Sequence, residues 1–276
     1  WRPGPFLNRD TSPMQASSIP WQQDLKATAR VALACLDLTS LNDADTEADI
    51  ARLCARAQGP FGAVAAVCVW PRLAAFARAQ LPASIAVAAV ANFPHGSADV
   101  QQAVRDTGTI VQSGAQEVDV VLPYRQLMAG DDSAVTALLV AVRKACEGLR
   151  LKVILETGVL QDDALIQRAC RLSLDAGADF LKTSTGKTPV SATPQAARTL
   201  LAAIAADLRY SARVGFKPSG GIRTVADAAT YIALTEEYLG TAALTPQRFR
   251  IGASSILSDI EAVLGDRTTP VATGTY

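Results

Sequence analysis

The feature that most constrains the fold is a regular alternation of short apolar runs with longer segments of helical period. From about residue 30 onward these runs are rich in Val and Ile and have the length of single strands, as in parallel sheets that helices cover on both faces. Eight runs predict eight strands: Val31–Asp37, Ala63–Val69, Ile85–Asn92, Glu117–Leu122, Leu151–Glu156, Phe180–Thr183, Val214–Lys217 and Phe249–Gly252. Eight strand–helix units in roughly 250 residues favour a single-domain (β/α)8 barrel.

Helix ends between the strands support this order. Ser97 is expected to cap a helix that stops at Gly114, and Thr193 followed by Pro194 is an N-cap with proline at the first helical position. The competing architecture is a doubly wound open sheet. Because no GxGxxG follows the first strand, the barrel is the better interpretation.

The predicted barrel occupies residues 24–264, with a segment on either side. Residues 1–23 are mostly polar and begin with a proline-containing stretch that lacks the apolar region of a secretory signal, so we expect a poorly ordered extension. Residues 265–276 form a polar tail that ends at Tyr276. Such tails usually fray.

Composition narrows the function classes. Lys and Arg number 26 and Asp and Glu number 26, so there is no basic excess to attract nucleic acid or an anionic membrane. No run reaches the roughly 18 apolar residues of a membrane-spanning helix. Five cysteines are scattered without CxxC spacing, which is typical of free thiols in a reducing compartment and predicts a cytoplasmic protein.

The sequence contains one histidine, His95, in the turn-like stretch Asn92–Gly96. Zinc-dependent hydrolases and metal-dependent aldolases use two or three imidazoles, and a Ser-His-Asp triad needs one beside its nucleophile. We therefore expect no catalytic metal, and a structural or supporting role for His95.

Two lysines lie within neighbouring apolar strands, Lys182 in the sixth and Lys217 in the seventh. Adjacent parallel strands are about 4.8 Å apart, so both side chains could enter one cavity. Desolvation and a neighbouring cation each lower the pKa of an amine, which makes a lysine nucleophilic near neutrality. The alternative is that each lysine extends its ammonium out of the barrel mouth.

Carboxylates are expected near these lysines. Asp119 lies between valines in the fourth strand, where its burial requires a cation, and it would be either a proton carrier or one half of a structural ion pair. Asp37 ends the first strand and is expected to have a structural or positioning role. Thr185 and Cys68, also at strand ends, are further candidates for positioning.

Glycine-rich loops follow the last three strands. Backbone amides of such loops and of helix N-termini bind anions, and barrels often hold phosphate after strands seven and eight. The sequence therefore predicts a phosphorylated ligand bound by Gly186, Lys187, Gly220, Gly221, Arg223, Gly252, Ser254 and Ser255.

Taken together, these motifs resemble one family. The stretches Lys182–Lys187, Val214–Gly221, Glu117–Val121 with Pro123–Arg125, Asn92–Gly96, Leu36–Thr39 and Gly252–Ser255 occur in the order seen in class I deoxyribose-phosphate aldolases. The resemblance runs from about residue 24 to the end of the chain, and the first 20 or so residues lie outside it.

The resemblance implies reversible cleavage of 2-deoxy-D-ribose 5-phosphate into acetaldehyde and D-glyceraldehyde 3-phosphate, in deoxynucleoside catabolism. It implies that Lys182 forms the Schiff base, that Lys217 keeps Lys182 nucleophilic, and that Asp119 moves protons with an ordered water. It further implies that the terminal Tyr276 moves the proton at C2 of the bound aldehyde, and that the protein is a dimer or tetramer.

Two other functional interpretations remain open. One is another Schiff-base barrel aldolase, such as one that acts on ketose phosphates. The other is a phosphosugar-binding or regulatory protein without turnover, against which the presence of Lys182, Lys217 and Asp119 argues.

Overall fold

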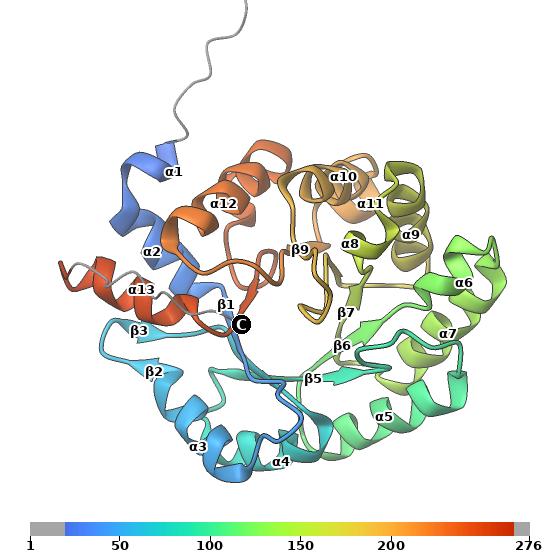
Figure 1. Cartoon of the computed structure of the whole chain (residues 1–276), viewed down its shortest axis with the longest axis horizontal. Coiled ribbons are helices and arrows are strands. Elements are labelled where there is room, and N and C mark those ends of the chain that lie inside the picture. Colours follow the sequence, from blue (N-terminus) through green and yellow to red (C-terminus); the bar gives the residue numbers. More distant parts are fainter. Residues whose placement is uncertain (1–19, 268–276) are drawn as a thin grey trace, which may run out of the picture.

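The computed structural model describes residues 20–267, and within them eight parallel strands form a barrel inside a ring of helices (Figure 1). Their order is β10-β1-β4-β5-β6-β7-β8-β9, and two isolated bridges, Phe216 to Phe249 and Ser219 to Gly252, join β9 to β10. The strands are β1 (Leu36–Thr39), β4 (Ala66–Val69), β5 (Ala86–Ala91), β6 (Glu117–Val121), β7 (Arg150–Ile154), β8 (Phe180–Lys182), β9 (Gly215–Lys217) and β10 (Ile251–Ala253). The predicted (β/α)8 barrel is confirmed.

The helices are amphipathic and place their apolar faces against the outside of the sheet. A short antiparallel pair, β2 (Gln58–Gly59) and β3 (Gly62–Ala63), precedes β4. The helices are α1 (Pro20–Gln23), α2 (Leu25–Ala34), α3 (Glu47–Arg56), α4 (Pro71–Gln80), α5 (Val100–Gln112), α6 (Tyr124–Met128), α7 (Asp132–Ala145), α8 (Thr157–Leu160), α9 (Asp163–Asp175), α10 (Pro194–Ala205), α11 (Leu208–Ser211), α12 (Val225–Leu239), the 3-10 helix η1 (Thr241–Ala243) and α13 (Ile256–Leu264). None of those between residues 20 and 267 combines the length and the apolar character needed to cross a membrane.

The first strand begins later than the sequence predicted. Residues 31–34 belong to α2, and the strand starts only at Leu36. Asp24 caps this helix by accepting a hydrogen bond from the backbone N–H of Ala27. The buried residues of α2 recur at helical spacing, Thr28 and Ala29 on one turn and Ala32 and Leu33 on the next. An apolar stretch that looked like a strand is therefore one face of a capped helix.

Other predicted boundaries need smaller corrections. Asp99, not Ser97, is the N-cap of α5, since its side chain accepts from the N–H of Gln102, whereas the Ser97 hydroxyl donates to Asn92. The second strand starts at Ala66, because residues 62–63 form the hairpin strand β3. The predicted cap at Thr193, followed by proline, is confirmed in α10.

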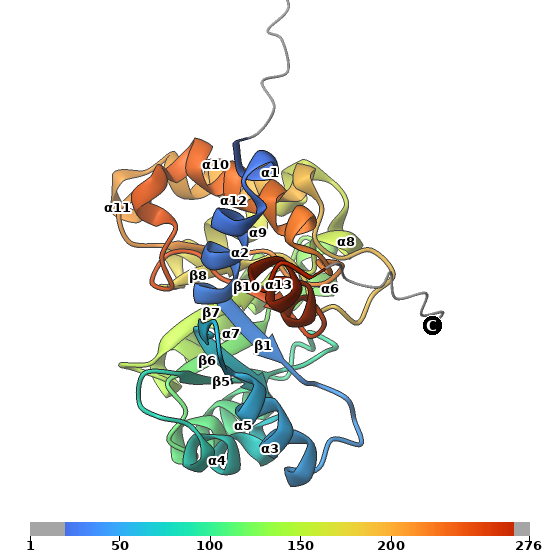
Figure 2. The same ribbon diagram turned by 90° about the vertical axis from the view of Figure 1, so that its left-hand side faces the viewer.

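Part of the predicted extension is structured, since residues 20–23 form α1. Trp21 of α1 donates from its indole nitrogen to Glu236 of α12 at 2.8 Å, and Figure 2 shows α1 and α2 lying along α12. Helix α2 also packs against α13. The added helices cover the side of the barrel where the first and last strands meet.

The sheet registers determine which side chains enter the barrel. Asp37, Cys68, Asp119, Lys152 and Lys182 belong to one set of alternating positions, as the neighbouring-strand pairs show. The opposite set, which includes Val67, Val118 and Leu181, belongs to the main apolar core. The barrel thus separates an apolar outer layer from an interior rich in charge.

Candidate active site

Two lysines lie side by side at the carboxyl end of the barrel. Lys182 on β8 and Lys217 on β9 are direct register partners, and Figure 1 shows β9 inside the ring of helices. The side chain of Lys182 is 3% exposed and that of Lys217 is fully buried. The two ammoniums therefore enter one interior space, as the sequence predicted.

Asp119 on β6 joins the two lysines. Its Oδ2 lies 2.8 Å from Nζ of Lys182 and 2.8 Å from Nζ of Lys217, while Oδ1 is 3.1 Å from Nζ of Lys152. Burial opposes ionisation of Asp119, but Lys152, Lys182 and Lys217 outweigh it and hold its pKa well below the usual range. Asp119 is therefore a buried carboxylate shared among three amines.

The two neighbouring lysines differ in acidity. Burial lowers the pKa of Lys182, and Lys217 lowers it further, while Asp119 acts in the opposite direction without reversing the result. The pKa of Lys217 is raised, because its two carboxylate partners, Asp119 and Asp37, outweigh the cost of burial. Lys217 thus stays an ammonium, and Lys182 is the amine that gives up its proton more readily.

Asp37 is fully buried beneath this pair. Its Oδ2 lies 2.5 Å from Nζ of Lys217 and 2.8 Å from Nζ of Lys152, and its Oδ1 lies 2.6 Å from Nη1 of Arg250. Burial opposes its ionisation, but the cations Lys152, Lys217 and Arg250 keep its pKa well below the usual range. These contacts give Asp37 three cationic partners and no exposure to solvent.

Cys68 and Thr185 occupy the positions predicted for them near the site. Cys68 is fully buried in a small interior cluster with Leu41, Ala88 and Val90, and burial raises the pKa of its thiol. The hydroxyl of Thr185 donates to Glu156 at 2.5 Å, and the backbone N–H of Thr185 donates to the same carboxylate at 3.2 Å.

The predicted phosphate loops meet through their glycines. Gly186, Gly220 and Gly221 all have positive φ, and a Cβ on Gly220 would lie 3.1 Å from Cα of Gly186 and 2.6 Å from Ser191. The N–H of Gly220 donates to the carbonyl of Gly252 at 3.3 Å. The loops after β8 and β9 are therefore adjacent, with bare backbone where Gly186 and Gly220 approach, and the second of them contacts β10 at Gly252.

The remaining predicted phosphate ligands are distributed around these loops. Nζ of Lys187 donates to the carbonyl of Leu41 at 2.7 Å, which links the loop after β8 to the loop after β1. Ser254 and Ser255 are exposed and directly precede α13. Arg223 is exposed before α12. Tyr276 lies outside the described residues.

Four charged residues around the site had no role predicted from the sequence. Lys152, Glu117 and Arg250 are buried inside the barrel, and Glu156 is buried just after β7 with φ of 56°. Burial raises the pKa of Glu156, whose oxygens accept from Thr185 and Thr188. Lys152 carried the same signal as Lys182, a lone lysine inside an apolar strand.

The arrangement combines an amine of lowered pKa, an ammonium of raised pKa beside it and a carboxylate that touches both. Such a set can form an imine with a carbonyl compound and move the protons that this requires. Among residues 20–267, no three His, Cys, Asp or Glu side chains gather as a metal site would require.

Comparisons with known proteins place the chain among aldolases. Residues 31–255 match the family described as DeoC/LacD family aldolase. A Toxoplasma gondii ME49 protein assigned as a deoxyribose-phosphate aldolase has a TM-score of 0.81 at 24% identity, over 90% of this chain and 98% of that one. A Coccidioides immitis protein with the same assignment has a TM-score of 0.74 at 28% identity, over 88% and 97%. Deoxyribose phosphate aldolase from Aeropyrum pernix, a tetramer, has a TM-score of 0.70 at 25% identity, over 88% and 95%. The chain belongs to the DeoC/LacD family of aldolases.

Proposed function

We propose that this aldolase reversibly cleaves 2-deoxy-D-ribose 5-phosphate into acetaldehyde and D-glyceraldehyde 3-phosphate through a Schiff base on Lys182. The observation that carries the proposal is the register pair of Lys182 and Lys217, both in contact with the same oxygen of Asp119. Of the two amines, the one with the lowered pKa is also the one with some exposure to solvent.

In the first stage the neutral amine of Lys182 attacks the aldehyde carbon C1 of the open-chain sugar. The carbinolamine loses water when its hydroxyl is protonated, and a protonated imine remains. Asp119, 2.8 Å from Nζ of Lys182, is placed to pass these protons with a water molecule. Lys217 stays protonated beside it and disfavours a second positive charge on the free amine of Lys182.

In the second stage the C3 hydroxyl loses its proton, the C2–C3 bond breaks, and its electron pair moves toward the iminium nitrogen to give an enamine. D-Glyceraldehyde 3-phosphate leaves with C3 as its new carbonyl carbon. A proton then adds to C2, and hydrolysis of the imine returns the amine and releases acetaldehyde. Tyr276, which we propose as the donor at C2, lies outside the described residues.

The phosphate is proposed to bind at Gly186, Lys187, Gly220, Gly221, Arg223, Gly252, Ser254 and Ser255. The adjacent glycine backbones after β8 and β9 and within β10 support this proposal, since bare amides and helix N-termini favour anions. We further propose a cytoplasmic homo-oligomer, a dimer or a tetramer, which acts in deoxynucleoside catabolism without a cofactor. The tetramer of the Aeropyrum pernix enzyme supports the oligomer.

The test is reduction with borohydride in the presence of acetaldehyde, followed by mass mapping of the peptides. We expect a two-carbon addition on Lys182 and no addition in Lys182→Met, with at least about a 10⁴-fold loss of cleavage activity. Lys144→Met, at a surface lysine of α7, is the matched control and should keep both. Addition at another lysine would refute the assignment.

The substrate is tested separately. Cleavage of 2-deoxy-D-ribose 5-phosphate should exceed cleavage of a ketose phosphate, and trapping with acetaldehyde should succeed. A preference for the ketose phosphate, with no acetaldehyde adduct, would favour the other Schiff-base aldolase. Binding of the phosphosugar with no reducible adduct would favour a protein without turnover.

A further inference from the structure

A second charged layer lies deeper in the barrel and does not touch Lys182. It consists of Glu117 on β6, Lys152 on β7 and Arg250 just before β10, hereafter the deep layer. Nη1 and Nη2 of Arg250 lie 3.1 Å and 2.7 Å from the two oxygens of Glu117, and Nζ of Lys152 lies 2.5 Å from Glu117. All three side chains are at most 2% exposed.

The deep layer is connected to the reactive amine through Asp37 and Asp119. Arg250 binds Oδ1 of Asp37, and the other oxygen of Asp37 receives Lys152 and Lys217. Lys217 in turn shares Oδ2 of Asp119 with Lys182. Arg250 is therefore linked to Lys182 through two carboxylates, within one buried set of ion pairs.

Counting the formal charges of this buried set shows an imbalance. Four side chains are cationic when protonated, and three are anionic: Lys152, Lys182, Lys217 and Arg250 against Asp37, Glu117 and Asp119. Lys182 has one carboxylate partner, and it shares that oxygen with Lys217. Water cannot screen an excess charge here, so the set is balanced when one amine is neutral.

Arginine is suited to this deep position because it does not give up its proton, and its two carboxylate partners raise the pKa of Arg250 further against the cost of burial. A lysine at the reactive position can lose its proton, whereas the guanidinium cannot. We propose that Arg250 is a positioning residue that occupies Asp37 and Glu117 and thereby makes Lys182 the group that becomes neutral. This inference rests on the proposed function.

Other groups around Lys182 do not replace Arg250 in this role. Cys68 on β4 is a buried thiol whose raised pKa keeps it neutral. Glu156, after β7, accepts hydrogen bonds from Thr185 and Thr188; Lys182 acts on it electrostatically, but it forms no direct ion pair with the amines and takes none of the contacts of Arg250. Arg150 lies 2.7 Å from Glu117, but its side chain is 32% exposed, so solvent screens much of its charge. The part that is not screened is positive and does not offset the cationic excess.

The experiment measures the pH midpoint of borohydride trapping with acetaldehyde in the full chain. Arg250→Met removes one cation, so the proton of Lys182 becomes better compensated. We expect the midpoint to rise by about one pH unit, which lowers trapping roughly tenfold at pH values below it. Glu117→Gln removes one anion, and the midpoint should fall.

Two further variants separate charge from structure. The double variant Arg250→Met with Glu117→Gln removes one charge of each sign and should return toward the wild-type midpoint. Arg250→Lys keeps the charge with altered geometry and should also stay near wild type. If Arg250→Met does not fold, as circular dichroism would show, the downward shift in Glu117→Gln is the decisive measurement.

An unchanged midpoint in Glu117→Gln, or shifts of Arg250→Met and Glu117→Gln in the same direction, would overturn the role of charge. An Arg250→Lys midpoint equal to that of Arg250→Met would overturn it as well. Failure of the wild-type protein to trap acetaldehyde on Lys182 would instead refute the proposed function. The two failures are thus distinguishable.

Discussion

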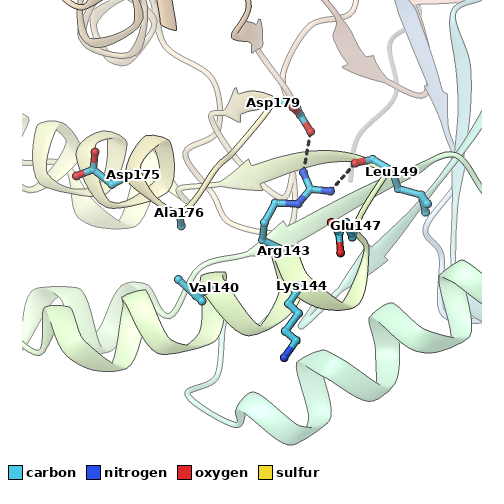
Figure 3. A pocket seen from close by; sticks show the side chains of 9 residues that line it. Val140, Arg143, Lys144, Glu147, Leu149, Asp175, Ala176 and Asp179 are labelled. Carbon is cyan, nitrogen blue, oxygen red and sulfur yellow. Dashed lines mark hydrogen bonds and ion pairs between the residues drawn. The ribbon is translucent and has the colours of Figure 1, made fainter. Parts of the chain in front are cut away.

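The inside of the barrel and a pocket at its amino-terminal end both bring acidic and basic side chains together, but only the first excludes water. The pocket has a volume of about 670 Å³ and lies where β7 and β8 begin. Figure 3 shows Arg143 directed at Asp179 and the carbonyl of Leu149, while Lys144 points away from them. The residues that line the pocket are Val140, Arg143, Lys144, Glu147, Gly148, Leu149, Asp175, Ala176 and Asp179.

The difference between the two regions is one of solvent. Arg143 and Asp179 are 2.9 Å apart with side chains 24% and 36% exposed, and such pairs contribute roughly 0 to 1 kcal/mol. Lys182 and Asp119 are 2.8 Å apart with at most 3% exposure. Removing one partner of a buried pair costs about 3 to 5 kcal/mol. Ion pairs of similar length therefore differ in what their loss costs in stability.

The largest expected effect is loss of stability in acid. The folded-state pKa values of Asp37, Glu117 and Asp119 lie below their unfolded values because cations outweigh the cost of burial. Their contribution to the unfolding free energy is complete above the pKa values of the unfolded chain, near pH 4.5. It is lost as the pH falls, because the unfolded chain then takes up protons that the folded chain does not. Three carboxylates give a slope of about 4 kcal/mol per pH unit.

Urea unfolding between pH 7 and pH 3 measures this slope. The unfolding free energy of the wild-type protein should be nearly constant above pH 5 and fall steeply below pH 4. Asp119→Asn, with one carboxylate fewer, should show a slope smaller by about 1.4 kcal/mol per pH unit. Equal slopes in the two proteins would contradict the role of Asp119 as a buried anion.

The next largest effect is that of Asp119→Asn at neutral pH. The change removes the proposed proton carrier and leaves Lys217 with one carboxylate partner in place of two. We expect a loss of about 10² to 10⁴ in cleavage rate and about 3 to 5 kcal/mol in unfolding free energy. Steady-state kinetics and urea denaturation measure the two.

The matched control is Asp179→Asn, the same substitution in the open pocket. It should leave the cleavage rate unchanged and lower the unfolding free energy by about 1 kcal/mol, because water can solvate the guanidinium of Arg143 once its carboxylate partner is gone. Comparable losses in the two variants would show that burial is not what distinguishes these carboxylates.

The sequence was sufficient to predict the barrel and the neighbouring positions of Lys182 and Lys217, because both depend on local pattern and strand order. Lys182 and Lys217 stood out as charges inside adjacent apolar strands, and adjacency follows from the order of the units. The predicted start of the first strand was wrong because residues 31–34 suit either a strand or a helix. The N-cap at Asp24 favours the helix.

The deep layer could not be predicted in the same way. Lys152 gave the same local signal as Lys182, but its depth and its partners depend on the registers of β1, β6 and β7. Arg250 meets Asp37 across 213 residues of chain. Sequence spacing does not give the register of one strand against another, and the register decides which side chains meet inside the barrel, so the balance of charge becomes visible only in three dimensions.

The smallest expected effect tests the pocket itself. Arg143→Ala removes the ion pair with Asp179 and the hydrogen bonds to the carbonyls of Cys146 and Leu149, which lie at the end of α7 and just before β7. We expect a loss of about 1 kcal/mol in unfolding free energy, since water can solvate all these groups once the side chain is gone. The part of this loss that comes from the ion pair should be smaller in 1 M NaCl. The Debye length there is about 3 Å, so the salt already weakens the pair in the wild-type protein. The kinetics and the trapping midpoint should match wild type, because no ion pair links Arg143 to the buried set within the described residues. A tenfold change in cleavage rate would show that this end of the barrel is coupled to Lys182 after all.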